Sequence, residues 1–137
     1  VWYLRAMNDI LGTAADIPDA AHLDQVAEIA GFALQRWRIA HKELVVAKHR
    51  ENTVFRVTAQ DGHRYALRVH QAGLHSEDAI CSELEWMRAL HAQGFPVPAV
   101  IETEEGKLVA TATAYGETRY CSLLAWVGGD LFNDLGR

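Results

Sequence analysis

The sequence has little cysteine, no long hydrophobic run and no excess of positive charge. Its 137 residues include two cysteines, Cys81 and Cys121, and neither belongs to a CxxC pair. Two such residues do not form a disulfide framework, so we interpret both as buried thiols of a reducing compartment. No hydrophobic run approaches the roughly 18 residues of a membrane-spanning helix, and the first residues lack the regions of a signal peptide. We therefore expect a cytoplasmic protein that does not contact membranes.

The charge balance excludes a general nucleic-acid binder. Thirteen Lys and Arg residues stand against 18 Asp and Glu residues, which gives a formal net charge of −5. A protein that neutralises many phosphates needs a basic surface, although a local phosphate site is compatible with this balance. The seven histidines show no ligand spacing on one element, so we expect no metal site within this chain.

What is present is an ordinary globular composition, with 50% hydrophobic and 23% charged residues, enough for one domain or part of a larger one. The patterns predict helices at 2–11, 22–33 and 76–93, a strand within 34–47 and a hairpin at 51–70. They also predict a second hairpin that joins 99–102 to 108–114, and a last strand at 118–127. The predicted fold is α+β, with a helix packed against one antiparallel sheet of about five strands.

The hairpin at 51–70 is the most informative stretch. Asp61-Gly62 suits a tight type I′ turn, which needs positive φ at both central residues. In the strand that follows, a period of two places Tyr65 and other apolar residues on one face, and Ala66 and Arg68 on the other. A small residue and a cation therefore lie two apart on one face.

The helix at 76–93 supplies a partner for this cation. On a helical wheel four residues form one apolar stripe: Ile80, Leu84, Met87 and Leu90. Glu83 lies inside the same stripe, where a carboxylate is costly unless it is paired. By themselves, Arg68 and Glu83 are also compatible with an exposed strand arginine and a helix-edge glutamate. Taken together, they predict an ion pair between the strand and the helix.

Four segments of the sequence resemble the aminoglycoside-phosphotransferase family of small-molecule kinases. They are ENTVFRV at 51–57, DGHRYALRVH at 61–70, SELEWMRAL at 82–90 and GFPVP at 94–98. The similarity covers about 44–129 and is greatest to the group that resembles type II homoserine kinases and choline kinases. It implies a protein-kinase-like N-terminal lobe at 34–127, after a helical extension at 1–33 and before the start of an inter-lobe linker at 128–137.

The resemblance also implies which residues hold ATP. Arg68 takes the place of the lysine that grips the phosphates, and Glu83 is its helix partner. The loop at 48–53 covers the phosphates with Asn52 and Thr53, although it contains no glycine. Ala66 leaves room for the adenine ring. The segment SLLAWVGG at 122–129 resembles the hinge, where backbone groups near Leu124, Ala125 and Trp126 bind the adenine edge.

The family resemblance places the chemistry elsewhere in the polypeptide. Asp130 and Asn133 superficially match a catalytic loop, but they lie too close together and directly after the hinge. The catalytic base and the Mg²⁺ ligands are therefore expected in a C-terminal lobe. Because the chain begins with Val and stops soon after Gly128-Gly129, we expect a fragment, inactive alone, of an ATP-dependent kinase that phosphorylates a small-molecule hydroxyl. A non-catalytic binding module with the same shape is the alternative hypothesis.

Overall fold

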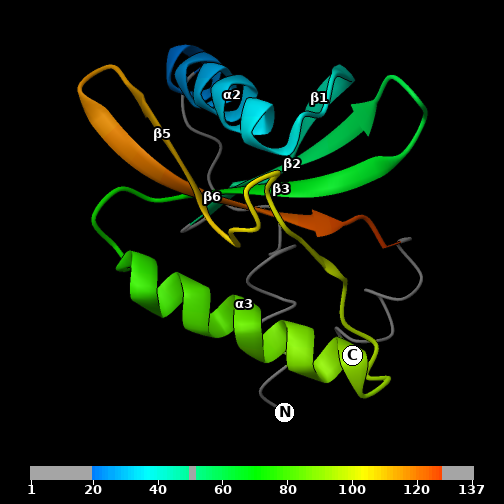
Figure 1. Cartoon of the computed structure of the whole chain (residues 1–137). Helices are drawn as coiled ribbons and strands as arrows, with labels where there is room; N and C mark the ends of the chain where they lie inside the picture. The colour runs from blue at the N-terminus through cyan, green and yellow to red at the C-terminus, as the bar shows by residue number, and fades with distance from the viewer. Residues whose placement is uncertain (1–19, 50–51, 128–137) are drawn as a thin grey trace.

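The computed structural model describes residues 20–49 and 52–127, which form one antiparallel sheet with a helix on each face (Figure 1). The elements are α2 (Ala20–Leu34), the 3-10 helix η1 (Gln35–Trp37), β1 (His41–His49), β2 (Asn52–Ala59), β3 (Arg64–His70), α3 (Glu77–Ala92), β4 (Val100–Ile101), β5 (Ala110–Ala114) and β6 (Glu117–Ala125). The predicted α+β class is confirmed, with six strands rather than about five. The helix predicted at 2–11 and the linker at 128–137 lie outside the described residues. No helix within 20–49 and 52–127 is long and apolar enough to cross a membrane.

The strand order is β1-β2-β3-β6-β4, and β5 also pairs with β6. The hairpin of β2 and β3 is confirmed, but its turn differs from the predicted type I′. The N–H of Gly62 donates to the carbonyl of Ala59 at 3.0 Å, and among the turn residues only Gly62 has a positive φ, of 92°. The connection is therefore a type I-like turn followed by a left-handed glycine, the usual arrangement when the loop is longer than two residues.

The strand predicted within 34–47 is present as β1, but the first residues of that range belong to other elements. Leu34 ends α2, residues 35–37 form η1, and β1 starts at His41. Arg38 separates the two elements in a left-handed conformation with φ of 51°. The apolar Trp37 that favoured a strand is instead buried at the end of the helix, where its indole N–H donates to the carbonyl of Ile101 at 2.9 Å.

The loop predicted at 48–53 is shorter than expected. The ladder between β1 and β2 continues through Lys48, which pairs with Val54, and His49, which pairs with Thr53. A register shift before Lys48 allows this pairing to continue beyond the apolar part of β1. Polar side chains suggested a loop, but backbone pairing sets the ends of these strands.

The prediction of a second hairpin, between 99–102 and 108–114, is wrong. Residues 103–107 do form a tight turn, in which the N–H of Thr103 donates to the carbonyl of Lys107 at 2.7 Å. However, β4 and β5 each pair with β6 instead of with each other, with Val100 opposite Leu124 and Ala110 opposite Cys121. The nine-residue β6 is long enough to hold both segments along one edge.

The helix predicted at 76–93 is confirmed as α3. The Ser76 hydroxyl caps its first turn by accepting from the N–H of Ala79 at 3.1 Å. Gly94, with φ of 87°, ends the helix in the left-handed conformation. The predicted stripe is buried against the sheet: Ile80, Leu84, Met87 and Leu90.

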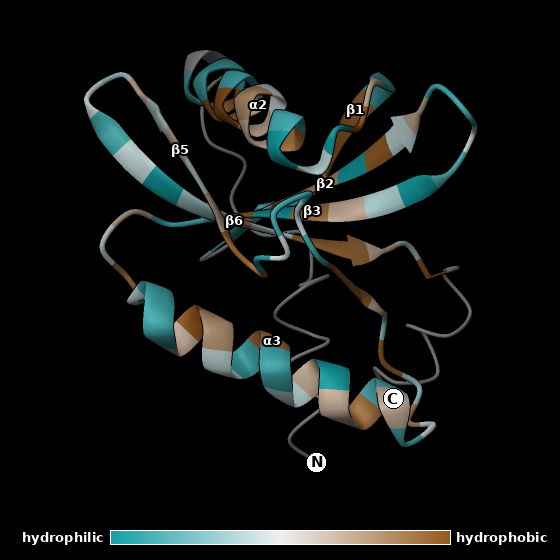
Figure 2. Ribbon diagram, in the orientation of Figure 1, coloured by the Kyte–Doolittle hydropathy of each residue, from teal (hydrophilic) through white to brown (hydrophobic). Residues whose placement is uncertain are grey.

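Each face of the sheet has its own core. Side chains of α2 pack on the face that carries Phe55, Leu67 and Val69. Side chains of α3 pack on the other face, against Val54 and Ala66. Figure 2 shows both helices with hydrophobic and hydrophilic residues interleaved, as expected of amphipathic covers on opposite sides of one sheet. The helix predicted at 22–33 is therefore a cover of the sheet.

Replacing a core residue of α2 tests this role. Ile29 is 2% exposed and Phe32 is 52% exposed on the same helix. We expect Ile29→Ala to lower the free energy of unfolding by about 2–5 kcal/mol, because it leaves a cavity. Phe32→Ala should change it by less than about 1 kcal/mol. Alanine raises helix propensity in both variants, so urea unfolding isolates the packing contribution. Equal effects would contradict the packing of α2 on the sheet.

Candidate functional site

Arg68 and Glu83 form the predicted ion pair. The Arg68 Nη1 lies 2.5 Å from the Glu83 Oε1, and the Arg68 side chain is 1% exposed while that of Glu83 is 32% exposed. The helical wheel and the strand alternation correctly placed these two residues face to face. The contact is made by one nitrogen and one oxygen instead of the two-pronged pairing that a guanidinium can make.

Ser122 and His70 complete the surroundings of the guanidinium. The Arg68 Nε donates to the Ser122 Oγ at 3.1 Å, and the same oxygen lies 3.2 Å from the His70 Nε2. Ser122 is fully buried and His70 is 3% exposed. The sheet brings these side chains together because Arg68 lies directly opposite Ser122 in the pairing of β3 with β6.

The imidazole of His70 is neutral. Burial, with smaller effects of the positive charge of Arg68 and of His75, lowers the pKa of His70 from its usual 6.5 to about 2. A second proton on His70 would place two buried cations side by side. The cluster thus has one positive charge, on Arg68, balanced by Glu83.

Several buried polar atoms on this face have no partner among the described residues. They are the Asn52 Oδ1, the Arg56 Nε, the Arg68 Nη2 and the His70 Nδ1. The register places Asn52 opposite His70 and Arg56 opposite Ala66, so all four side chains share the face of β2 and β3 that α3 covers. Buried polar groups are normally hydrogen-bonded, so a set without partners on one face makes this face the candidate ligand site.

The remaining predicted residues lie around this cluster. Ala66 is 3% exposed and Leu124, directly opposite it on β6, is fully buried. Both belong to the apolar cluster on the α3 face, which Trp126 joins as a partly buried member. These residues form an apolar region next to the charged pair.

The hinge segment already uses two of its backbone donors. The N–H of Ala125 donates to the carbonyl of Ala99 at 2.9 Å, and the N–H of Trp126 donates to the carbonyl of Arg64 at 3.2 Å. A ligand at this segment therefore has to use other backbone groups.

Asn52 and Thr53 point to opposite faces of β2. Asn52 shares the face of Arg68, whereas the Thr53 hydroxyl bonds to the His49 Nδ1 at 2.7 Å on the α2 side. Burial, with smaller effects of His22 and Arg119, lowers the pKa of His49. Thr53 can therefore contribute to the Arg68 face only through its backbone.

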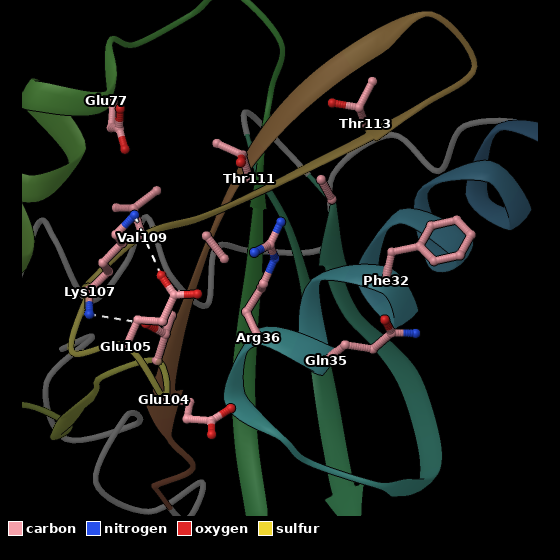
Figure 3. A pocket seen from close by; sticks show the side chains of 13 residues that line it. Phe32, Gln35, Arg36, Glu77, Glu104, Glu105, Lys107, Val109, Thr111 and Thr113 are labelled. Atoms are coloured by element: carbon pink, nitrogen blue, oxygen red, sulfur yellow. Dashed lines mark hydrogen bonds and ion pairs between the residues drawn. The ribbon is translucent and has the colours of Figure 1, made fainter.

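A hollow in the surface lies elsewhere. It encloses about 530 Å³ beside β5 and is lined by Phe32, Arg36, Glu104, Lys107 and Thr111, among other residues (Figure 3). Its charged side chains are largely exposed, and no unpartnered buried polar atom within the described residues faces it. Residues 20–49 and 52–127 also contain no group of three or more His, Cys, Asp or Glu side chains arranged for a metal ion.

The cysteines offer no nucleophile. Cys121 is buried as predicted, and burial raises the pKa of its thiol to about 12. Cys81 is only partly buried, and burial together with nearby carboxylates raises its pKa also.

Comparison with known proteins identifies the family. Residues 42–134 match the sequence profile of the Phosphotransferase enzyme family. The chain belongs to this family. The resemblance to aminoglycoside phosphotransferases is thereby confirmed, and no curated protein sequence matches the chain.

Two solved structures of small-molecule kinases are similar to this phosphotransferase-family chain. A microcompartment-associated aminopropanol kinase superposes with a TM-score of 0.69 and 30% identity over 75% of this chain. The amicoumacin kinase hAmiN, in complex with AMP-PNP, Ca²⁺ and Ami, gives 0.58 and 20% identity over 82% of this chain, which shows a shared fold. The chain spans 32% of the length of each kinase, and its antiparallel sheet with packed helices matches a kinase-like N-terminal lobe.

Sequence reasoning missed His70 and Ser122 as neighbours of the Arg68 guanidinium. A period of two along β3 already places His70 next to Arg68 on the same face, so that signal was available. Ser122 lies 54 residues from Arg68 in the chain, and only the pairing of β3 with β6 brings it there.

The neutral state of His70 predicts acid sensitivity. The unfolded chain binds a proton at His70 below about pH 6.5, whereas the folded chain does so only near pH 2. The free energy of unfolding should therefore fall as the pH drops below 6.5, by about 1.4 kcal/mol per pH unit from this residue. Urea unfolding at pH 7.5 and 5.5 measures the difference.

The matched variants are His70→Asn and His63→Gln. His63 is an exposed loop histidine, so His63→Gln should keep the loss of stability at acid pH. His70→Asn removes the titrating group and should reduce the loss by about 1.4 kcal/mol at pH 5.5. A drop in His70→Asn as large as in the unmodified protein would show that His70 is not the source.

Proposed function

We propose that this chain is the ATP-binding N-terminal lobe of a small-molecule kinase that transfers a phosphoryl group from ATP to a substrate hydroxyl. The observation that carries the proposal is the buried Arg68, held by Glu83 while its Nη2 has no partner within the described residues. A phosphate oxygen accepts hydrogen bonds and carries negative charge, so it fits this free donor. Membership of the phosphotransferase family and the likeness to two kinases support the same activity.

The proposal assigns a role to each candidate site residue of the lobe. Arg68 binds the phosphates, and Glu83 fixes the position of its guanidinium. Ala66 and Leu124 belong to the apolar region next to it, which in this proposal contacts the adenine ring. Asn52 lies on the same face beside the phosphates.

Two groups contribute their backbone. Thr53 supplies its peptide unit at the start of β2, since its hydroxyl is directed to the other face. The segment from Leu124 to Trp126 binds the adenine edge through groups other than the two N–H donors already used.

When bound, ATP supplies the phosphoryl group, and Mg²⁺ neutralises the charge that develops on it. The catalytic base and the Mg²⁺ ligands are proposed to come from residues beyond this lobe, because the described part of the chain offers no cluster of metal ligands. The lobe itself contributes binding and orientation, which together with charge stabilisation supply most of the catalysis in phosphoryl transfer.

The direct test removes the guanidinium. We expect Arg68→Ala to weaken ATP binding by the full-length protein roughly 10- to 100-fold, because a charge-assisted hydrogen bond contributes about 1.5–3 kcal/mol. Arg64→Ala is the matched control, since Arg64 lies on the same strand and the same face but is exposed. Isothermal titration calorimetry with Mg·ATP at fixed salt measures both.

Unchanged ATP affinity in a folded Arg68→Ala variant would contradict the role of Arg68. No binding of ATP or ADP by the unmodified protein would favour the non-catalytic module, for which the absence of glycine in residues 48–53 is the supporting observation.

A further inference from the structure

We propose that His70 and Ser122 extend the phosphate-binding site, with Ser122 positioning the Arg68 guanidinium and His70 donating a hydrogen bond to the phosphate chain through its Nδ1. This inference rests on the proposed function, because it concerns how the same site holds ATP. It adds an uncharged donor and a positioning hydroxyl to the ion pair of Arg68 and Glu83.

The hydrogen-bond directions follow from the donor inventory. The Arg68 Nε can only donate, so the Ser122 Oγ accepts at that contact, 3.1 Å away. The Ser122 hydroxyl keeps one hydrogen, and the His70 Nε2 lies 3.2 Å from its oxygen. Directing that hydrogen to the His70 Nε2 satisfies both groups, and the single ring proton of a neutral imidazole then resides on Nδ1.

In the group of Arg68, Ser122 and His70, two buried donors are then left without a partner among residues 20–49 and 52–127. They are the Arg68 Nη2 and the His70 Nδ1, on side chains that are 1% and 3% exposed. An unsatisfied donor at such depth costs about 1–3 kcal/mol, which an acceptor in the ligand would recover. Phosphate oxygens are acceptors only, so they match a pair of donors.

The location of His70 fits this role. Its residue pairs with Asn52 at the start of β2, next to the connection between β1 and β2 that the family resemblance places over the phosphates. Ala66, beside the apolar region, lies four residues away toward the other end of the strand. Along β3 the order is therefore the apolar Ala66, the charged donor Arg68 and the neutral donor His70.

The neutrality of His70 suits a position beside a buried guanidinium. A lysine at this point would add a second positive charge close to Arg68, whereas the imidazole donates without charge. The backbone carbonyl of His70 accepts from the Arg119 Nη1 at 3.2 Å, which fixes the end of the strand from the opposite side.

Two substitutions at position 70 separate the two functions of the ring. In His70→Gln the terminal amide oxygen takes the place of Nε2 and accepts from the Ser122 hydroxyl, so the contact with Ser122 is kept and the Nδ1 donor is lost. In His70→Asn the amide nitrogen occupies the place of Nδ1, so the donor is kept and the contact with Ser122 is lost. His63→Gln is the control, because His63 is exposed in the turn of the β2–β3 hairpin.

The measured quantity is the ratio of ATP affinity to adenosine affinity, determined by calorimetry on the full-length protein. We expect His70→Gln to lower this ratio about tenfold, the effect of one lost hydrogen bond to a charged group. His70→Asn should retain more of the ratio than His70→Gln, and His63→Gln should leave it unchanged. If His70 had a merely structural role, its replacement would lower the affinities for ATP and for adenosine equally, and the ratio would not change.

The positioning role of Ser122 has a spectroscopic readout that needs no nucleotide. The Nε–H signal of Arg68, identified by its loss in Arg68→Lys, should shift in Ser122→Ala and return toward its original position in Ser122→Cys. We expect Ser122→Ala also to lower the ratio of ATP to adenosine affinity. If Ser122→Ala does not fold, the inference is tested by His70→Gln and His70→Asn and by the position of the Arg68 Nε–H signal in Ser122→Cys.

The outcomes separate this inference from the proposed function. If the unmodified protein binds ATP and a folded His70→Gln keeps the ratio, the donor role of His70 is wrong while the function stands. If the Arg68 signal is unmoved in Ser122→Ala, the positioning role of Ser122 is wrong. If the unmodified protein binds no nucleotide, both the function and the inference fail.

Discussion

The structure depends on burying one guanidinium between the sheet and α3. Arg68 is 1% exposed, and removing the partner of a buried ion costs about 3–5 kcal/mol, so α3 has to hold Glu83 opposite β3. The apolar stripe of α3 sets this register, because burying Leu84 against the sheet brings the adjacent Glu83 to the edge of the same face. Packing of the helix and formation of the site are therefore one event.

The two faces of the sheet differ in what they bury. On the α2 face, Leu67, Val69 and Phe55 meet apolar side chains of the helix, so that cover is a conventional core. On the α3 face the same strands present Arg68 and His70, and the apolar cluster lies beside them. The sheet can carry buried polar groups on its α3 face because the core on its α2 face supplies hydrophobic burial that does not depend on the site.

Local patterns found the centre of the site and missed its surroundings for physical reasons. Alternation along β3 and the wheel of α3 both operate over a few residues, and together they placed Arg68 opposite Glu83. Ser122 enters only through pairing of strands far apart in the chain, which no local period encodes. The same limit explains the erroneous second hairpin, since whether β4 and β5 pair with each other or with β6 depends on the edge that β6 offers.

The charge balance of the cluster shows what kind of ligand it suits. Arg68 is compensated by Glu83, and burial keeps His70 neutral, so the site has no net charge to attract a bare anion strongly. Its distinguishing property is instead a set of buried polar atoms on Arg68 and His70 without hydrogen-bond partners within the described residues. Attraction by charge acts over about a Debye length and is weakened by salt, whereas a hydrogen bond requires contact and orientation. Such a site distinguishes ligands by their geometry. It favours a ligand in which a ring bound at the apolar region next to Ala66 places a phosphate at Arg68.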